Sequence, residues 1–176
     1  CEGLVGSEMC IRDRYKIDFN KEIKEENITE WGLSKPLTHF EEEIDFWNWA
    51  KDFNGSSIFR NLKTYDNAVE VLYEVSKSGH EVVIISSKPW WSIHDTLVWL
   101  GENKIPSKEI HFLEDKWKID CDVYIDDAPH QLKSFVENVP DKLILRFVRP
   151  YNRPIAGTKD LNNWLELNSL LESYNL

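Results

Sequence analysis

Cysteine, glycine and proline are scarce in this chain of 176 residues, which contains three, seven and seven of them. The cysteines, Cys1, Cys10 and Cys121, form no Cys-x-x-Cys pair and have no histidine at the spacing of a zinc site. This excludes a zinc ribbon and argues against a disulfide framework. We therefore expect a reducing, cytoplasmic location. No apolar run approaches the length of a membrane span and no signal peptide is visible, so we expect no membrane partner.

Basic charge is also in short supply. Lys and Arg total 21 against 31 Asp and Glu, which gives a formal net charge of -10. A protein that binds a nucleic-acid polymer normally carries a basic stripe, and none is visible in this sequence. An acidic chain can still bind a small phosphate when a divalent cation supplies positive charge. Aromatic residues, by contrast, are plentiful, and eight Trp, eight Phe and six Tyr exclude a disordered or fibrous chain.

Residues 1–14 show neither helical nor strand periodicity. The run from Leu4 to Arg14, LVGSEMCIRDR, resembles the translation of a transposase-type sequencing-library adapter. We therefore expect residues 1–14 to be non-native, and we leave them out of the fold prediction. The alternative interpretation is a native but irregular N-terminal arm.

Residues 15–58 are predicted to form a small helical cap. One helix is expected from Tyr15 to Glu26. A second helical stretch follows Pro36, which is tolerated in a first helical turn, and it extends to Phe53. This second stretch is rich in aromatic and acidic residues, and no strand pattern interrupts the region.

Residues 59–176 alternate short apolar strands with amphipathic helices. The first helix begins near Tyr65, where Thr64 or Asp66 can cap it, and Gly79 stands where a C-terminal glycine belongs. Alternation of this kind predicts an α/β core with a parallel sheet and right-handed crossovers. Strands are predicted over 81–85, 110–113, 122–125 and 143–148, and further helices over 92–100, 129–136 and 160–171.

Polar side chains follow three of these predicted strands. Because ligands of a parallel sheet bind at the carboxyl ends of its strands, these side chains should meet at one edge. Adjacent acids can hold Mg²⁺, and a lysine and a serine hydroxyl can bind phosphoryl oxygens. Taken singly, each has a structural alternative: a serine that ends a strand, a solvated lysine, or an aspartate that caps the helix after Pro129. In chain order they are Ser86, Ser87, Lys88, Lys116, Asp126 and Asp127.

The order Ser86, Lys116, Asp126-Asp127, with a spacing of ten residues from Lys116 to Asp126, resembles motifs two, three and four of the haloacid dehalogenase superfamily of phosphohydrolases. More closely, the chain from about Tyr15 to Trp164 resembles the 5′(3′)-deoxyribonucleotidase (type C 5′-nucleotidase) family. The supporting stretches are Ile28-Thr29-Glu30-Trp31, Phe59-Arg60-Asn61-Leu62, Gly79-His80-Glu81-Val82, Ile85-Ser86-Ser87, Asp115-Lys116, Tyr124-Ile125-Asp126-Asp127-Ala128-Pro129 and Arg149-Pro150-Tyr151-Asn152-Arg153.

The resemblance implies a Rossmann-like, haloacid dehalogenase-like core with a small helical cap. It also implies a Mg²⁺-dependent phosphomonoester hydrolase that acts on nucleoside monophosphates, deoxyribonucleotides above all, through an aspartyl-phosphate, and that often forms a homodimer. Ser86 would bind phosphoryl oxygens, Lys116 would neutralise charge around the nucleophile, and Asp126 and Asp127 would hold Mg²⁺, with Asp127 favoured as the direct ligand. Ser87, Lys88, Phe46, Trp47 and Trp90 are candidate substrate contacts, although each of these aromatic residues could instead pack in the core.

One departure from the family is serious. Its first motif, an apolar strand followed by Asp-x-Asp, is absent near the start of this sequence. We therefore expect this chain to lack the nucleophile, the acid/base and the first strand of the sheet, and to be inactive. Two alternatives remain: a noncatalytic phosphate-binding pseudoenzyme, and a receiver-like signalling domain. Receivers place their acid pair first and their lysine last, which is the opposite of the order seen here.

Overall fold

The structure of the protein is a computed structural model that describes residues 7–32, 39–52 and 55–176. Its α-helices are α1 (Ser7–Phe19), α2 (Glu43–Lys51), α3 (Ala68–Lys77), α4 (Ile93–Glu102), α5 (Pro129–Asn138) and α6 (Leu167–Ser173). Its strands are β1 (Val83–Ser86), β2 (Glu109–Phe112), β3 (Val123–Asp126), β4 (Leu143–Phe147) and β5 (Lys159–Leu161). Short 3₁₀-helices are η2 (Glu25–Asn27), η3 (Ile58–Asn61), η4 (Trp90–Ser92), η5 (Lys116–Lys118) and η6 (Trp164–Glu166).

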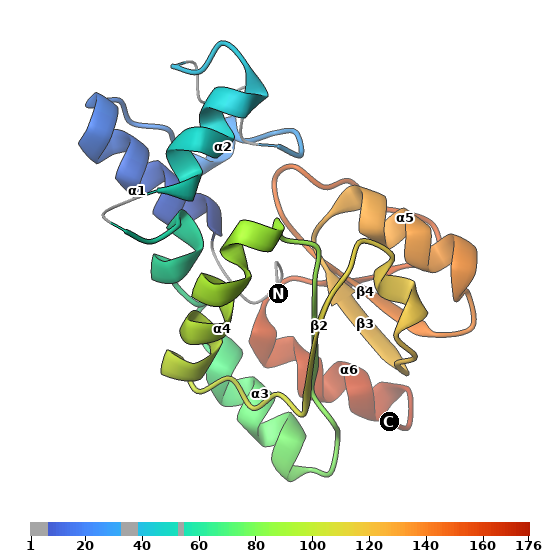
Figure 1. Cartoon of the computed structure of the whole chain (residues 1–176). Coiled ribbons are helices and arrows are strands. Elements are labelled where there is room, and N and C mark those ends of the chain that lie inside the picture. Colours follow the sequence, from blue (N-terminus) through green and yellow to red (C-terminus); the bar gives the residue numbers. More distant parts are fainter. Residues whose placement is uncertain (1–6, 33–38, 53–54) are drawn as a thin grey trace.

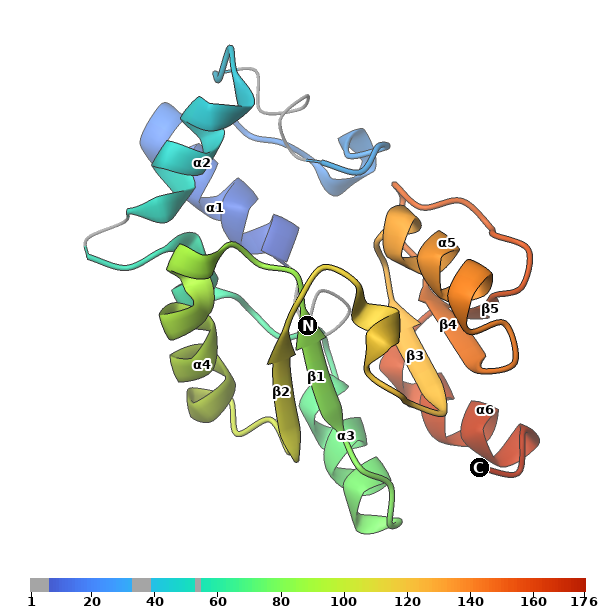
Figure 2. The same ribbon diagram turned by 45° about the vertical axis from the view of Figure 1, so that its right-hand side comes forward.

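All strand pairs are parallel, as the alternation of strands and helices predicts. β1 pairs with β2, with Val83 opposite Glu109, and β3, β4 and β5 form a second sheet in that order. Among the described residues no hydrogen-bonded ladder joins the two sheets. The predicted α/β class is therefore confirmed, and the parallel sheet is divided into two parts (Figure 2).

A slot lies between these two parts. It has a volume of about 550 Å³ and is lined by residues of β1 and β3, including Val83, Ile84, Val123 and Ile125. Lys116 and Asp126 also border it. Among the described strands, β1 and β3 are each the edge strand of a parallel sheet, so an unpaired strand edge flanks the slot on each side.

Helices cover both faces of the larger sheet. Tyr124 and Ile144 pack with Leu132 and Phe135 of α5, whereas the next residue of β4, Leu145, faces the main core. This alternation follows from the two-residue period of a strand. The main core also contains apolar residues of α3, α4 and α6, and Figure 1 shows α3 and α6 on the side away from α5.

Helices α1 and α2 form a separate helical layer above the end of β1 (Figure 2). Their contact is largely aromatic: the ring of Trp49 in α2 lies 6.4 Å from Tyr15 and 6.0 Å from Phe19 in α1, and Tyr15 is fully buried. Part of this layer falls within residues 15–58, where a cap is predicted, and the division of the chain into cap and core stays a prediction. Of the second predicted helical stretch, only residues 43–51 are helical, and residues 36–38 and Phe53 lie outside the described part of the chain.

Three details of the prediction were wrong. α1 begins at Ser7 and not at Tyr15, and it ends at Phe19. The predicted helix over 160–171 starts too early, because Asp160 and Leu161 pair with β4 as strand β5. The residue that precedes α3 is Asn67, whose side chain makes no capping hydrogen bond, and not Thr64 or Asp66. In the described part of the chain, no helix is both long and apolar enough to cross a membrane.

Candidate active site

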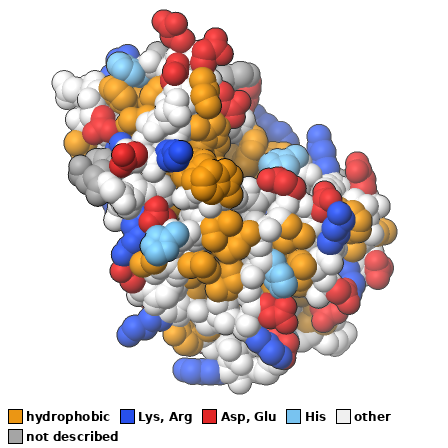
Figure 3. All heavy atoms as spheres, viewed as in Figure 1, with side chains coloured by type: hydrophobic (Ala, Val, Ile, Leu, Met, Phe, Trp, Pro, Cys, Tyr) orange, Lys and Arg blue, Asp and Glu red, His pale blue; other side chains and the backbone are white. Residues whose placement is uncertain are grey.

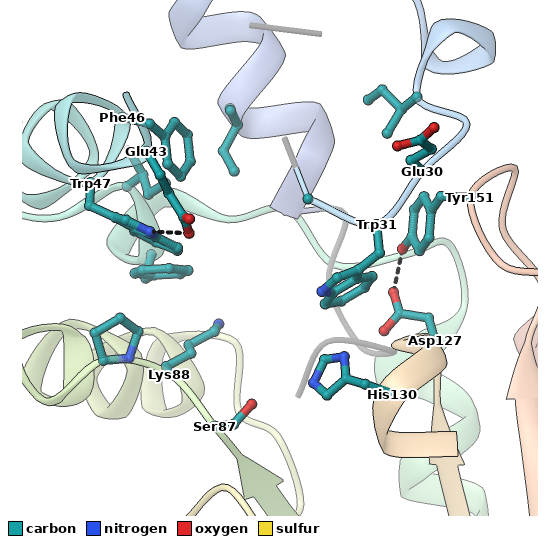
Figure 4. A pocket seen from close by; sticks show the side chains of 16 residues that line it. Glu30, Trp31, Glu43, Phe46, Trp47, Ser87, Lys88, Asp127, His130 and Tyr151 are labelled. Atoms are coloured by element: carbon teal, nitrogen blue, oxygen red, sulfur yellow. Dashed lines mark hydrogen bonds between the residues drawn. The ribbon is translucent and has the colours of Figure 1, made fainter. Parts of the chain in front are cut away.

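A cleft of about 290 Å³ opens between the helical layer and the carboxyl ends of β1 and β3. Ser87 and Lys88 line it from the segment after β1, and Asp127 lines it from the segment after β3. Phe46 and Trp47 line it from α2 in the helical layer (Figure 4). The cleft therefore brings together polar groups from two strand ends and aromatic groups from the helical layer.

Ser86 ends β1 and is fully buried. Its hydroxyl oxygen has no hydrogen-bond partner among the described residues. A buried hydroxyl without a partner costs free energy, so the position suits a ligand that accepts a hydrogen bond from it. Ser87 and Lys88 follow it into the cleft, and the Lys88 ammonium lies 4.6 Å from the centre of the Phe59 ring.

Lys116 and Asp126 form a buried ion pair. Lys116 Nζ lies 2.7 Å from Asp126 Oδ2, and the two side chains are only 2% and 5% exposed. Asp126 Oδ1 accepts a second hydrogen bond from the Ala128 amide at 2.9 Å. Burial alone would raise the pKa of Asp126, but the Lys116 ammonium outweighs it and the pKa is lowered. Asp126 is thus held as a carboxylate, and Lys116 is fixed beside it.

Asp127 is the acid that faces the cleft. Its Oδ2 accepts a hydrogen bond from the Tyr151 hydroxyl at 2.6 Å (Figure 4), and its backbone carbonyl accepts one from Asn152 Nδ2 at 2.8 Å. The residue is 3% exposed. Asp126 and Asp127 therefore have different surroundings: the first is paired with a lysine, and the second is turned toward the cleft.

The donor set here fits Mg²⁺. In the described part of the chain, no group of three or more His, Cys, Asp or Glu side chains could hold a metal by itself. Mg²⁺ does not need such a cage, because it commonly uses one or two carboxylates and fills its remaining positions with waters and substrate phosphates. Asp127, with Asp126 beside it, could hold the ion in that way.

Of the predicted aromatic contacts, Phe46 and Trp47 line the cleft and Trp90 does not. Trp47 Nε1 donates to Glu43 Oε1 at 3.0 Å, which orients the indole ring. Trp90 is 79% exposed, and the Lys51 ammonium lies 5.9 Å from the centre of its ring. The structure thus gives Trp90 no place in this cleft.

Residues that the sequence did not single out complete the cleft. Trp31 lies edge-on to Tyr151 and to His130, with ring centres 5.5 Å apart in each case, and Glu30 lines the same wall. Their signal in the sequence was weak, since Trp31 and Tyr151 appeared only within longer motif stretches. Figure 4 shows Trp31, Tyr151, His130 and Asp127 grouped on one side of the cleft, opposite Trp47 and Lys88.

The sequence holds one Asp-x-Asp pair, Asp120 and Asp122. It precedes β3, whereas a carboxylate at the rim must follow a strand. Both side chains are turned to solvent, with exposed fractions of 88% and 82%. They cannot serve as nucleophile and acid/base in this cleft.

Basic side chains do not gather on the face of the molecule that Figure 3 shows. There, Lys and Arg are interspersed with Asp and Glu.

Comparison with known proteins identifies a family. Residues 5–174 match the family model described as 5′ nucleotidase, deoxy (pyrimidine), cytosolic type C protein.

Relatives with similar sequences bear related names. A protein of Oceanobacillus iheyensis named "Putative nucleotidase" is 29% identical over 115 residues, which cover 60% of each chain. A protein of Bacillus cereus with the same name is 26% identical over 149 residues, or 75% of this chain and 71% of that one. A "Putative 5′(3′)-deoxyribonucleotidase" of Chlorobaculum tepidum is 22% identical over 111 residues. The chain spans 60% of the first relative's length and 52% of the third's.

Proposed function

Because this chain belongs to the cytosolic type C 5′-nucleotidase family, we propose that its cleft binds a nucleoside monophosphate for Mg²⁺-dependent hydrolysis of the phosphoester. One observation carries the proposal. Asp127 lines an aromatic cleft together with Ser87 and Lys88, at the carboxyl ends of β1 and β3, and the residues that precede them on these strands, Ser86 and the Asp126 that is paired with Lys116, are buried. The receiver-like alternative has no support from the family match.

The polar side of the cleft would bind the phosphate. Ser86, whose buried hydroxyl lacks a partner among the described residues, would donate to a phosphoryl oxygen, and Ser87 and Lys88 would bind the remaining oxygens. Lys116 would balance the negative charge that accumulates beside Asp126. Mg²⁺, when bound by Asp127 and Asp126, would supply the positive charge that stabilises a transferring phosphoryl group.

The aromatic rings on the two facing walls of the cleft would bind the nucleoside. Phe46 and Trp47 face Trp31 and Tyr151 across the cleft, and aromatic faces stack on bases with little sequence preference. The family description and the name of the Chlorobaculum relative favour a deoxyribonucleotide, and the former favours a pyrimidine. We also propose a cytoplasmic location, which the free thiol of Cys121 supports.

The resemblance implies that hydrolysis needs an Asp-x-Asp at the end of an apolar strand, where the first aspartate would form an aspartyl-phosphate. The only such pair in these 176 residues points to solvent before β3. We therefore propose that these residues bind substrate without hydrolysing it, and that the slot between β1 and β3 is the position of the strand that bears the Asp-x-Asp.

The proposal is tested by titrating the chain with thymidine 5′-monophosphate in the presence of MgCl₂ by calorimetry. We expect saturable binding that weakens at least about tenfold without Mg²⁺ and in Asp127→Asn, because that substitution removes a carboxylate ligand. Asp122→Asn is the matched control, since Asp122 is exposed, and it should bind as the unmodified chain does. Equal affinity for thymidine, which lacks the phosphate, would contradict the proposal.

A noncatalytic phosphate-binding protein is the second candidate, and the missing Asp-x-Asp favours it. This candidate predicts the same nucleotide binding. It differs in predicting that a chain to which the Asp-x-Asp strand is added still releases no phosphate.

A further inference from the structure

The loop that follows β4 contacts Asp127 twice, although it lies 24 residues further along the chain. The Tyr151 hydroxyl donates to Asp127 Oδ2 at 2.6 Å, and Asn152 Nδ2 donates to the Asp127 backbone carbonyl at 2.8 Å. Tyr151 and Asn152 are 6% and 4% exposed. A hydrogen bond from a hydroxyl to a carboxylate at this length is charge-assisted and strong, so it restricts the rotation of the Asp127 side chain.

The loop itself is held by a buried network. Asn152 Nδ2 also donates to the Phe147 carbonyl at 2.8 Å, and Asn152 Oδ1 accepts from the Arg149 amide at 3.0 Å. The Arg146 guanidinium donates to Asn152 Oδ1 at 3.0 Å and forms two hydrogen bonds with Asp160 of β5, at 2.9 and 2.7 Å. Tyr151 therefore approaches Asp127 from a backbone that is fixed on both sides.

We propose that Tyr151 is a positioning residue that fixes the Asp127 carboxylate in the orientation needed to bind a divalent cation. The inference rests on the proposed function, because that function makes Asp127 the cation ligand. Groups that hydrogen-bond to a ligating carboxylate orient it, and their loss typically weakens metal binding by about 10- to 100-fold. Tyr151 also borders the aromatic wall beside Trp31, so the same ring serves the nucleoside side of the cleft.

A comparison of Mg²⁺ and Ca²⁺ affinities distinguishes a positioning role of Tyr151 from a merely structural one. Mg²⁺ requires near-ideal octahedral geometry, whereas Ca²⁺ accepts flexible geometry. A carboxylate that has lost its orienting hydrogen bond should therefore lose affinity for Mg²⁺ more than for Ca²⁺. A general loosening of the fold would lower both affinities together.

The test measures Mg²⁺ and Ca²⁺ affinities of the full chain by calorimetry, without nucleotide. In Tyr151→Phe, which removes only the hydroxyl, we expect Mg²⁺ binding to weaken at least about tenfold and Ca²⁺ binding less than threefold. Tyr73→Phe is the matched control, since Tyr73 lies half-exposed on α3, and its affinities should be unchanged. Thermal unfolding of each variant confirms that it is folded.

Two results overturn the inference in distinguishable ways. If Tyr151→Phe binds both cations as the unmodified chain does, or loses both to the same extent, the positioning role is wrong while the proposed function stands. If the unmodified chain binds no Mg²⁺ even with thymidine 5′-monophosphate present, the proposed function fails and the positioning role fails with it.

Discussion

At the scale of single residues, the ion pair between Lys116 and Asp126 is costly in free energy because both charges are buried. Two charges have been taken out of water, and each is tolerable only because the other lies 2.7 Å away. Such a pair is weak evidence of stability by itself. Its presence at the end of β3, beside an acid that faces the cleft, is better explained by a requirement for fixed charges at a site.

The pair makes a prediction about stability. Lys116→Met leaves the Asp126 carboxylate buried without its partner, so the free energy of unfolding should fall by about 3–5 kcal/mol. Adding Asp126→Asn removes the uncompensated charge and should restore part of this loss. Urea denaturation followed by circular dichroism measures both, and Lys118→Met, on an exposed side chain, is the control. An unchanged midpoint in Lys116→Met would show that the pair is not buried as described.

The sequence indicates part of the candidate site and not the rest. That Ser86, Lys116, Asp126 and Asp127 act together stays a prediction, and it could be made because each lies at or shortly after the end of a recognisable strand, and parallel strands bring their carboxyl ends to one edge. Tyr151 was not, because its contact with Asp127 depends on the path of a loop and the direction of one side chain. Neither leaves a periodic signal.

At the scale of elements, the end of α3 shows a C-terminal cap in detail. Gly79 has a φ of 99°, its amide donates to the Ser76 carbonyl at 3.2 Å, and the His80 amide donates to the Val75 carbonyl at 3.3 Å. These two bonds are the pattern of the Schellman motif, which ends a helix with a left-handed residue. The cap turns the chain directly into β1.

Two glycines allow a matched test of this cap. A Cβ added at Gly79 or at Gly101 would meet nothing within 4 Å, so packing does not distinguish them. Gly79→Ala should lower the free energy of unfolding by about 1–2 kcal/mol, because alanine is strained at a left-handed φ. Gly101→Ala, inside α4, should raise it by up to about 1 kcal/mol. Urea titration of both variants measures the free energies of unfolding. If both substitutions changed the free energy in the same direction, the assignment of Gly79 as a left-handed helix cap would be wrong.

An exposed ion pair joins η3 to α4. A hydrogen bond from Arg60 holds the pKa of Glu102 below its ordinary value. A lowered carboxyl pKa contributes stability above the unfolded-state pKa of roughly 4.3, and the contribution is lost as the pH falls through the folded value.

Glu102→Gln should therefore lower the melting temperature slightly at pH 7. The difference from the unmodified chain should vanish at a pH below the folded-state pKa of Glu102, where its carboxyl group is protonated. In a chain that already carries Arg60→Gln, which removes the partner of the ion pair, Glu102→Gln should make no such difference. A difference that persists at low pH would mean that the charge of Glu102 is not its source. Differential scanning calorimetry at several pH values provides the measurement.

Strand prediction succeeded where the residues themselves are apolar. β1, β3 and β4 were located to within two residues because short apolar runs such as Val82–Ile85 are typical of strands inside a parallel sheet. β5 was missed because Lys159-Asp160-Leu161 has no apolar run, and it exists through pairing with β4 and through the bonds between Asp160 and Arg146. α1 began earlier than predicted because burial of Ile11 and Tyr15, and not a periodic pattern, holds it in place.

At the scale of the whole molecule, the division of the sheet is the feature that bears most on function. β1 and β3 flank a slot of about 550 Å³, and their carboxyl ends carry Ser86 and Asp126. A strand placed there would end between these two residues. The slot is therefore where the proposed function requires the Asp-x-Asp.

Adding that strand is the decisive test of activity. A chain extended by an apolar strand that ends in Asp-x-Asp should hydrolyse thymidine 5′-monophosphate in the presence of Mg²⁺, which phosphate release measures. The same extension ending in Asn-x-Asn is the matched control: it should raise the melting temperature equally and release no phosphate. Stabilisation by both extensions without hydrolysis by either would favour the noncatalytic alternative.

The divided sheet should also change the order in which backbone amides exchange with solvent deuterium. In most α/β proteins the innermost strands exchange last, since they have a neighbour on each side. Here, among the described residues, β4 alone is paired on both sides, whereas β1 and β3 are each paired on one. The amides of β1 and β3 should therefore take up deuterium sooner than those of β4. A strand bound in the slot would pair with both and should slow their exchange to the rate expected of inner strands.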